Sequence, residues 1–350
     1  MSTTKKQGAT LSFQPKQVTK RLLSVLPERA RDILICRYGL GKSPIRMTLE
    51  AIGTKYGITR ERVRQIENYA IQTIRKSKQY EKERKSFTEL KNVLKSAGGI
   101  VAEHELMELV SRSESIQNHV HFLLVVGEEF TRFKEDERFH HRWHVDSQIA
   151  EEIHGALERL YKNLSDDDII PESEMISRFL EETRNASEKY KNQEIAKRWL
   201  GISKQMDRNP LGEWGRAHSP NINAKGMRDY AYLVLRKHGS PIHFEEVAKA
   251  IETLFNKKAH VATTHNELIK DARFVLVGRG LYALKDWGYV SGVVKDVIRK
   301  ILQQNGPLTK DEVIDKVMKE RYVKENTILV NLQNPRYFKK RPDGRYENAR

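Results

Sequence analysis

The most regular pattern of apolar positions lies in residues 60–76, RERVRQIENYAIQTIRK. Val63, Ile66, Ala70 and Ile74 are spaced by 3, 4 and 4 residues, which places them in one stripe along a helix. At about 100° of rotation per residue, the polar side chains at 60–62, 64–65 and 68 point away from this stripe. The pattern predicts a helix that is buried on one side and polar on the other.

Two further helices precede this one. Pro27 suits the first turn of a helix that continues to Tyr38 and stops at Gly39. Thr48 caps a second helix that ends at the Gly57 turn, and Thr59 caps the long helix. Two helices joined by a glycine turn predict a helix-turn-helix over residues 19–82. Residues 1–18 show no periodicity and predict a flexible tail.

The rest of the chain repeats one layout: a helix, a Gly or Pro break, a short apolar pair and a second amphipathic helix. The layout occurs in 94–110, 235–251 and 302–318, and more weakly in 164–180. Three of the copies end in alternating stretches that predict hairpins, at 128–145, 272–289 and 335–350. The repeat predicts tandem winged-helix domains, although a run of unrelated small α+β modules would give a similar pattern.

The predicted fold class is therefore mainly α with small β-wings: an N-terminal helix-turn-helix followed by tandem winged helices. We expect domains at 86–146, 149–222, 226–289 and 291–350. The second of these is divergent, because the turn-rich stretch 209–215 replaces its hairpin with an irregular loop.

The net charge of the chain indicates which class of partner it binds. The chain of 350 residues has 63 Lys+Arg against 47 Asp+Glu, a net charge of +16, which favours a polyanion. Lys55 to Lys95 holds twelve basic and five acidic residues, a net of +7. No stretch approaches the roughly 18 apolar residues of a membrane span, and the N-terminus lacks the apolar core of a signal peptide. We expect a cytoplasmic, nucleoid-associated protein without a membrane partner.

Each residue type on the outer face of helix 60–76 suits contact with DNA. An arginine fork can bind guanine, a glutamate can accept from cytosine, and a glutamine can pair with adenine. Thr59 and the amides of the helix N-terminus suit a phosphate. The alternative is that this is only a solvated helix face, but the capped start, the glycine turn and the local charge favour DNA.

Catalytic patterns are weak. His140, His141 and His144 cluster but lack an accompanying metal-ligand motif, and we interpret them as surface or packed histidines. The lone Cys36 fits a helix core better than a nucleophile, and Asp166 to Asp168 fit a solvated loop. The glycine pairs form no phosphate-binding loop. We therefore expect no enzymatic activity, no cofactor and no metal.

Residues 26–76, with the core TLEAIGTKYGITRERVRQIE, resemble region 4 of the sigma-70 family of bacterial transcription initiation factors. The resemblance implies binding to a −35 promoter element and docking of the module's apolar concave side on the β-subunit flap of RNA polymerase. By motif position, it implies base contacts from Arg60, Glu61 and Gln65, and backbone contacts from Thr59, Arg62 and Arg64. We find no counterpart of the family's promoter-melting region, and only about 20 residues precede the module, so we expect that the chain does not open promoters by itself.

Residues 226–288 are similar to the HARE winged-helix domain, which occurs in the delta subunit of RNA polymerase and in some restriction and chromatin-associated proteins. The resemblance implies an adaptor of nucleic acid or the transcription machinery. We expect secondary nucleic-acid contacts, although these charges could equally serve solubility alone. The candidates are Lys270, Arg273, Arg279, Lys339, Lys340, Arg341 and Arg345.

The leading hypothesis is a sequence-specific DNA-binding transcription protein whose partners are double-stranded DNA at promoter-like sites and the RNA polymerase core. Two alternatives stay open: a polymerase accessory protein that acts mainly through protein contacts, and the DNA-targeting component of a defence or modification system. The target sequence, the direction of regulation and the oligomeric state do not follow from the sequence.

Overall fold

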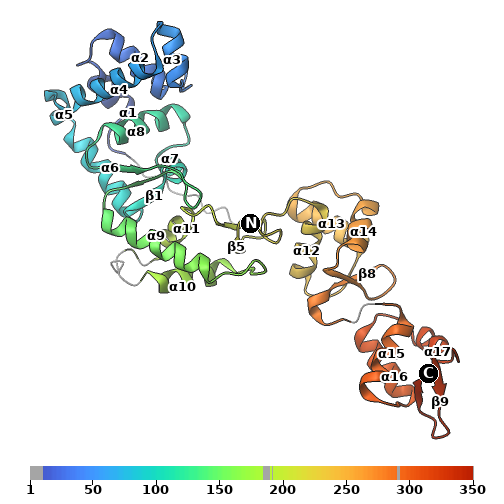
Figure 1. Ribbon diagram of the computed structural model, residues 1–350. Helices are drawn as coiled ribbons and strands as arrows, with labels where there is room; N and C mark the ends of the chain where they lie inside the picture. The colour runs from blue at the N-terminus through green and yellow to red at the C-terminus, as the bar shows by residue number, and fades with distance from the viewer. Residues whose placement is uncertain (1–10, 184–189, 191, 290–291, 350) are drawn as a thin grey trace. The chain divides into compact units, whose positions relative to one another are not determined.

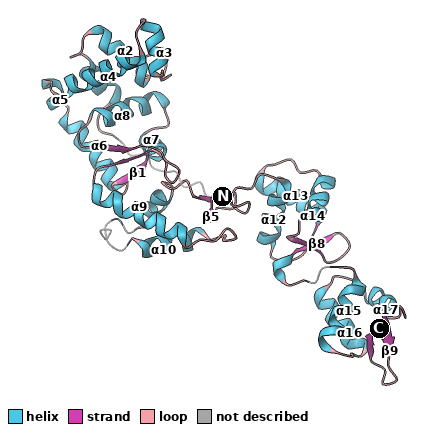
Figure 2. Cartoon of the chain, in the orientation of Figure 1, coloured by secondary structure: helices cyan, strands magenta, loops and turns pink. Residues whose placement is uncertain are grey.

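The computed structural model is mainly helical, with short antiparallel strands, as the sequence predicts (Figures 1 and 2). It describes residues 11–183, 190, 192–289 and 292–349. The chain forms two compact units, residues 1–207 and 208–350. Within the described residues, no helix combines the length and apolar character needed to cross a bilayer.

The first unit begins with four helices: α1 (Pro15–Leu23), α2 (Glu28–Tyr38), α3 (Leu49–Tyr56) and α4 (Arg60–Arg75). The expectation of a flexible tail through residue 18 is wrong for residues 11–18, and residues 1–10 lie outside the described part of the chain. Leu11 and Phe13 pack against the core, and Val18 is fully buried in it. These apolar side chains, together with Pro15 at the first turn of α1, explain why residues 11–18 adopt a defined structure.

The next segment follows the predicted order of helix, strand, helix, helix and hairpin. After the short α5 (Lys78–Lys82) come α6 (Arg84–Ser96), β1 (Ile100–Ala102), α7 (Glu103–Val110) and α8 (Glu114–Val126). β2 (Thr131–Phe133) and β3 (Arg142–His144) complete an antiparallel sheet of order β1-β3-β2. Val101 and Arg132 both lie opposite Trp143 in this register.

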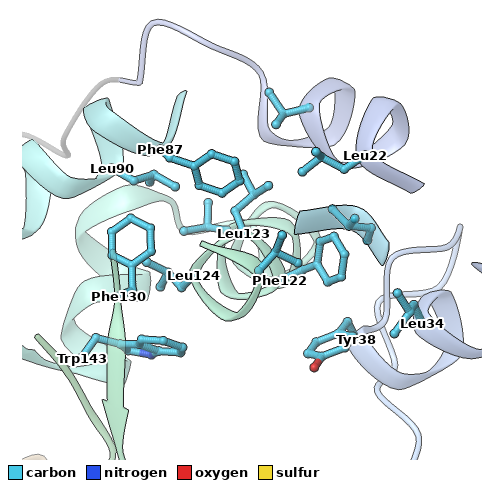
Figure 3. Packing of buried hydrophobic residues seen from close by; sticks show 14 of the residues in the cluster. Leu22, Leu34, Tyr38, Phe87, Leu90, Phe122, Leu123, Leu124, Phe130 and Trp143 are labelled. Atoms are coloured by element: carbon cyan, nitrogen blue, oxygen red, sulfur yellow. The ribbon is translucent and has the colours of Figure 1, made fainter. Parts of the chain in front are cut away.

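Helix α8 lies at the centre of a core that joins this segment to the helix-turn-helix. Its Val120, Phe122, Leu123, Leu124 and Val126 are fully buried. The same cluster contains Leu22, Leu34 and Ile74 from α1, α2 and α4, and Trp143 from the sheet. Figure 3 shows Leu22, Tyr38, Phe87, Phe130 and Trp143 around Phe122, Leu123 and Leu124. The boundary expected near residues 83–85 therefore runs through one shared core.

Polar side chains add specific links between the same elements. The guanidinium of Arg75, in the last turn of α4, donates hydrogen bonds to the carbonyl oxygens of Val125 and Val126 at 3.1 and 2.9 Å. Those carbonyls belong to the C-terminal turn of α8, which lacks intrahelical donors. Arg75 thus caps α8 from a helix that lies fifty residues earlier in the chain.

The remainder of the first unit consists of α9 (Ser147–Lys162), α10 (Glu172–Glu182) and α11 (Gln193–Leu200). The indole of Trp199 is fully buried and donates to the carbonyl oxygen of Gly98, beside β1, at 3.2 Å. Strand β4 (Met206–Arg208) precedes the stretch 209–215, and β5 (Trp214–Arg216), which belongs to the second unit, begins inside it. The sequence predicted only an irregular loop there, and this expectation is wrong for Trp214 and Gly215 because both belong to a strand. Within that stretch, the amide of Asn209 donates to the carbonyl oxygen of Glu213.

The second unit repeats the helix, strand, helix, helix and hairpin order over residues 227–287. Its elements are α12 (Met227–His238), β6 (Ile242–His243), α13 (Phe244–Phe255), α14 (Val261–Lys270), β7 (Phe274–Leu276), β8 (Leu281–Leu284) and the short 3-10 helix η2 (Lys285–Trp287). The antiparallel sheet has the order β6-β8-β7. This is the arrangement that the sequence predicted for 226–289.

The last segment contains α15 (Val294–Asn305), α16 (Lys310–Glu320), α17 (Glu325–Leu332), β9 (Phe338–Lys340) and β10 (Tyr346–Asn348). β9 and β10 pair as the predicted hairpin, and Leu308 forms a bridge to Tyr346 where the layout expects a short strand. Val297, Ile298, Val313, Val317 and Ile328 are fully buried in the core of this segment.

Candidate DNA-binding surface

The turn between α3 and α4 brings the two helices into close contact. The amide of Ile58 donates to the carbonyl oxygen of Gly53 at 3.0 Å. A Cβ atom on Gly53 would lie 2.6 Å from the carbonyl oxygen of Ile58, so this crossing requires a glycine. Gly57 ends α3 with a φ of +64°, the left-handed conformation that favours glycine. The predicted helix-turn-helix geometry thus depends on two glycines.

A threonine caps each of the two helices, as the sequence predicts. The Thr48 hydroxyl accepts from the Ala51 amide at 3.1 Å, and the Thr59 hydroxyl accepts from the Arg62 amide at 3.2 Å. The hydroxyl proton of Thr59 remains available for donation, because capping uses only an acceptor lone pair. The N-terminus of α4 therefore combines a donor with the positive end of the helix dipole, which suits a phosphate.

The inner side of α4 is buried as its apolar spacing predicts. Val63, Ala70 and Ile74 are fully buried, and Val63 packs with Ile33 and Ile52 in a small cluster beneath α3 and α4. This burial fixes which side of α4 faces outward.

Glu67 is the one acidic residue within the apolar stripe and is not among the predicted site residues. Its side chain is buried, and Oε1 accepts a hydrogen bond from the Tyr38 hydroxyl at 2.7 Å. Arg37 Nε lies 3.5 Å from the same oxygen. Burial, followed by the Glu67 charge, raises the pKa of Tyr38, so the phenol stays protonated and donates. The signal in the sequence was a carboxylate four residues after Val63, on the buried face.

The predicted contact residues on α4 lie together on its exposed side. The Arg60 side chain is 70% exposed, with Nε 3.0 Å from a carboxylate oxygen of Glu50 on α3. Arg64 donates two hydrogen bonds to the Glu61 carboxylate, at 2.9 and 2.7 Å. Arg62 donates to the Gln65 side-chain oxygen at 3.1 Å. The polar face opposite the buried stripe is therefore accessible.

These pairings have a chemical consequence. The hydrogen bonds from Arg64 lower the pKa of Glu61, so this carboxylate is ionised and can act only as an acceptor. Exposed ion pairs contribute only about 0–1 kcal/mol, so a nucleic acid can replace them at small cost. A base that engages Glu61 releases the Arg64 fork for a second contact. The surface is thus suited to exchange of internal partners for base edges and phosphates.

The three secondary candidates in residues 226–289 differ in accessibility. Lys270 ends α14 and Arg279 lies in the loop between β7 and β8, and both are exposed. Arg273 instead binds Asp271 at 2.7 Å and Asp229 at 3.1 Å, and its guanidinium lies over the Tyr232 ring. Arg273 is therefore a structural residue that ties α12 to the hairpin, which corrects the expectation of a nucleic-acid contact there.

The four candidates in the last segment lie on or beside the β9–β10 hairpin. Lys339 and Lys340 are exposed on β9, and Arg345 is exposed just before β10. Arg341 Nε lies 2.7 Å from a carboxylate oxygen of Glu347, so part of its charge is compensated. The hairpin presents a basic surface to which Lys339, Lys340 and Arg345 contribute most.

The residues considered for catalysis pack against, or form hydrogen bonds with, neighbouring residues of the fold. His144 is buried and its ring stacks on Phe133, with the ring centroids 4.6 Å apart. The ring of His141 accepts a hydrogen bond from the Glu135 amide. Cys36 is half-buried, with Lys55 Nζ 3.3 Å from its sulfur. Within the described residues, no group of three or more His, Cys, Asp or Glu side chains is arranged to hold a metal ion.

Comparison with known proteins gives two kinds of relative. Residues 22–76 match the family model described as sigma-70, region 4. The RNA polymerase sigma factor RpoS of Coxiella burnetii is 48% identical over 56 residues, 16% of each chain. The sigma factor SigA1 of Synechococcus elongatus is 48% identical over 54 residues, 15% of this chain and 13% of the relative. A probable RNA polymerase delta subunit of Lactococcus lactis subsp. cremoris is 26% identical over 82 residues, 22% of this chain and 44% of the relative.

The chain thus spans 13–16% of the length of these two sigma factors and 44% of the length of the delta subunit. The matched residues 22–76 include all of α2, α3 and α4 and most of the exposed surface described above. Residues 22–76 are therefore similar to region 4 of sigma-70 factors and fold as a helix-turn-helix.

Proposed function

We propose that this chain is a DNA-binding transcription protein that associates with RNA polymerase and recognises promoter-like sites through α4. The observation that carries the proposal is the exposed polar face of α4 from Thr59 to Gln65, on a capped helix whose other side is buried. The similarity of residues 22–76 to sigma-70 region 4 supports the same function. In this proposal the chain acts in the cytoplasm by binding, without a catalytic step of its own.

The base readers in this proposal are Arg60, Glu61 and Gln65, with Thr59, Arg62 and Arg64 on the sugar-phosphate backbone. The short, capped start of α4 supports this division, because the N-terminal residues of a recognition helix enter the major groove. The basic hairpin of the last segment supplies sequence-independent phosphate contacts from Lys339, Lys340 and Arg345.

The resemblance to sigma-70 factors also suggests that the module's apolar side docks on polymerase. In this chain the apolar residues that α1, α2 and α4 direct away from the recognition surface pack on α8. A polymerase contact through those residues would require α8 to leave a core in which eight of its thirteen residues are buried. We therefore propose that polymerase association uses another surface of the chain.

The function is tested by selecting binding sites for the full chain from a random duplex library and measuring the dissociation constant on the selected site. We expect a recurrent motif and a steep salt dependence, with a slope of about −0.9 in log K per phosphate neutralised. Binding to purified core RNA polymerase is measured in parallel. Binding to polymerase without any selected motif would reject the DNA-reading function and favour an accessory protein. Failure to bind polymerase would reject the association.

A further inference from the structure

Exposed lysines line the two helices that follow α4 in the first unit (Figure 1). Lys78 and Lys82 are one turn apart on α5, so their side chains share a face. On α6, the exposed face opposite the buried stripe begins with Lys85 and ends with Lys95. We call these four lysines the lysine ridge.

The lysine ridge continues from α5 to α6, because the single residue Glu83 separates the two helices. The Glu83 amide donates to the carbonyl oxygen of Gln79 at 3.3 Å, and the Glu83 carbonyl oxygen accepts from the Phe87 amide at 3.4 Å. Both bonds have the i to i+4 spacing of an α-helix, so the chain stays close to helical at this point. Lys82 and Lys85 are three positions apart across Glu83, and their side chains are therefore neighbours.

The inner sides of α5 and α6 fix the position of the lysine ridge relative to α4. Phe87 and Leu90 of α6 are buried in the core that also contains Ile74 of α4. The carboxylate of Glu83 is buried and accepts hydrogen bonds from the guanidinium of Arg21 on α1. The backbone that carries the ridge is thus held in place before any ligand binds, which lowers the entropic cost of binding.

The positive charge of the lysine ridge is not compensated within the protein. Across the residues that the structure describes, none of the four lysines forms an ion pair or a side-chain hydrogen bond. The neighbouring carboxylates have other partners, since Glu81 pairs with Arg84 at 2.9 Å and Glu89 accepts hydrogen bonds from Ser12. A row of uncompensated cations favours a polyanion as its ligand.

The lysine ridge is better suited to a nucleic acid than to a protein. Among the described residues of the first unit, the exposed large hydrophobics are Ile45 and Tyr69, and neither belongs to α5 or α6. Lysine is depleted at protein interfaces, whereas binding to a phosphate backbone depends on cations that neutralise it. Thr88 and Asn92, which are exposed between the lysines of α6, can donate hydrogen bonds to phosphate oxygens.

We propose that the lysine ridge binds the phosphates of the duplex that flanks the site read by α4. The 16 residues of α4 separate Thr59 from the start of α5 by about 24 Å, which corresponds to about 7 base pairs along a duplex. This inference rests on the DNA-reading function proposed above and adds a contact outside the recognised bases. The bases that α4 reads set the position of the protein on the duplex, and the ridge adds affinity that does not depend on sequence.

The experiment measures binding of the full chain to two duplexes that contain the selected site. One duplex ends at the site, and the other extends about two helical turns beyond it on both sides. Dissociation constants are measured by fluorescence anisotropy over a series of salt concentrations. The melting temperature and the binding to core RNA polymerase are recorded for every variant.

Two variants are compared with the unmodified chain. The ridge variant combines three substitutions: Lys78→Gln, Lys82→Gln and Lys85→Gln. The control variant removes the same charge from three exposed lysines of the second unit: Lys237→Gln, Lys249→Gln and Lys285→Gln. The pair separates the position of the lost charge from its amount.

On the extended duplex, we expect the ridge variant to bind at least tenfold more weakly than the unmodified chain. The slope of log K against log salt should become less steep by about 2.7, which is about 0.9 for each of three phosphates. On the duplex that ends at the site, the ridge variant should match the unmodified chain. The control variant should match it on both duplexes, and all three proteins should have the same melting temperature.

Equal salt slopes for the ridge and control variants on the extended duplex would overturn the flanking contact and leave the reading by α4 intact. An equal loss of affinity on both duplexes would also overturn it, because the ridge would then act within the site itself. Weaker polymerase binding at unchanged DNA binding would assign the ridge to a protein partner instead. If the unmodified chain selects no site, the DNA-reading function is rejected and the flanking contact with it.

Discussion

The side-chain amide of Asn118 donates a hydrogen bond to the carbonyl oxygen of Pro44 at 2.6 Å, across 74 positions in the sequence. The same nitrogen lies 3.2 Å from the carbonyl oxygen of Gly39, and Asn118 Oδ1 accepts from Arg46. One buried residue on α8 thereby fixes the loop between α2 and α3 of the helix-turn-helix. Gly39, with a φ of +63°, makes room for it, since a Cβ atom there would lie 2.6 Å from the Asn118 nitrogen.

Asn118→Ala removes these hydrogen bonds and leaves two carbonyl groups without their donor. We expect the free energy of unfolding to fall by about 1–3 kcal/mol, the usual cost of buried polar groups that lose their partner. Chemical denaturation of the full chain measures the change. Asn68→Ala, which truncates an exposed amide on α4, is the control and should stay within about 0.5 kcal/mol of the unmodified chain. An equally small effect at Asn118 would contradict the role of α8 in holding this loop.

Replacing both Arg60 and Glu61 by alanine tests the recognition surface. Discrimination between the selected site and sites with single mismatches should fall by about 1–3 kcal/mol per base pair contacted. Competition gel-shift measurements give the discrimination directly, and Arg178→Ala on α10 is the control for loss of an exposed arginine. If the double variant keeps full discrimination, α4 does not read bases through these residues.

Glu61→Ala alone should change discrimination and overall affinity in different ways, because Glu61 forms an ion pair with Arg64. The substitution removes a negative charge that faces DNA and releases the Arg64 fork from its internal partner. We expect weaker discrimination at the selected site together with unchanged or tighter binding to random duplex. A parallel loss of affinity for both kinds of duplex would indicate that Glu61 matters only for the structure of α4.

Changing Lys339, Lys340 and Arg345 to glutamine tests the basic hairpin. Because these side chains are assigned to phosphates, binding to selected and random duplexes should weaken by a similar factor. The salt slope should fall by about 0.9 for each phosphate that the variant no longer neutralises. Arg341→Gln is the comparison, and we expect a smaller effect because Glu347 already compensates Arg341. Loss of discrimination in the triple variant, at constant salt slope, would place these residues at base edges instead.

Buried His121 predicts a pH dependence of stability. Burial, followed by the positive charge of Arg46, lowers the pKa of His121 to about 4 from 6.5, although Glu103 opposes the shift. Between these two pH values the unfolded chain binds the proton and the folded chain does not. The titration of His121 therefore takes nothing from the free energy of unfolding above pH 6.5 and lowers it as the pH drops toward 4.

In His121→Leu this titration is absent, so the loss of stability between pH 6.5 and pH 4 should shrink by up to about 3 kcal/mol. Urea denaturation at a series of pH values measures both curves. His260→Leu, at an exposed histidine, is the control for the exchange of a histidine for a leucine. Parallel curves for His121→Leu and the unmodified chain would show that His121 does not titrate differently in the two states.

The sequence predicted the elements that depend on local chemistry. The apolar spacing of α4, its threonine caps and the Gly57 turn are all set by residues within one or two helical turns of one another. The exposed face from Thr59 to Gln65 followed from the same periodicity. The repeated hairpins were predicted for the same reason, because alternation and turn residues are local signals.

Long-range contacts account for what the sequence did not predict. Arg273 looked like a surface cation, but its partners Asp229 and Asn221 lie 44 and 52 positions earlier. Glu67 looked like one charge among many until Tyr38, 29 positions away, gave it a buried hydrogen bond. No local pattern identified the helix-turn-helix as the other half of the core around α8. Pairings of this kind depend on how the chain folds back on itself, which periodicity does not encode.

The burial of α8 against the helix-turn-helix limits how such a module can pass between genes. A gene fragment that ends after α4 would encode a protein with Leu22, Leu34 and Ile74 facing water, and apolar patches of this kind promote aggregation. A stable fragment that contains the helix-turn-helix should therefore extend through residue 126. Any descendant that loses α8 has to acquire a new cover for the same three helices.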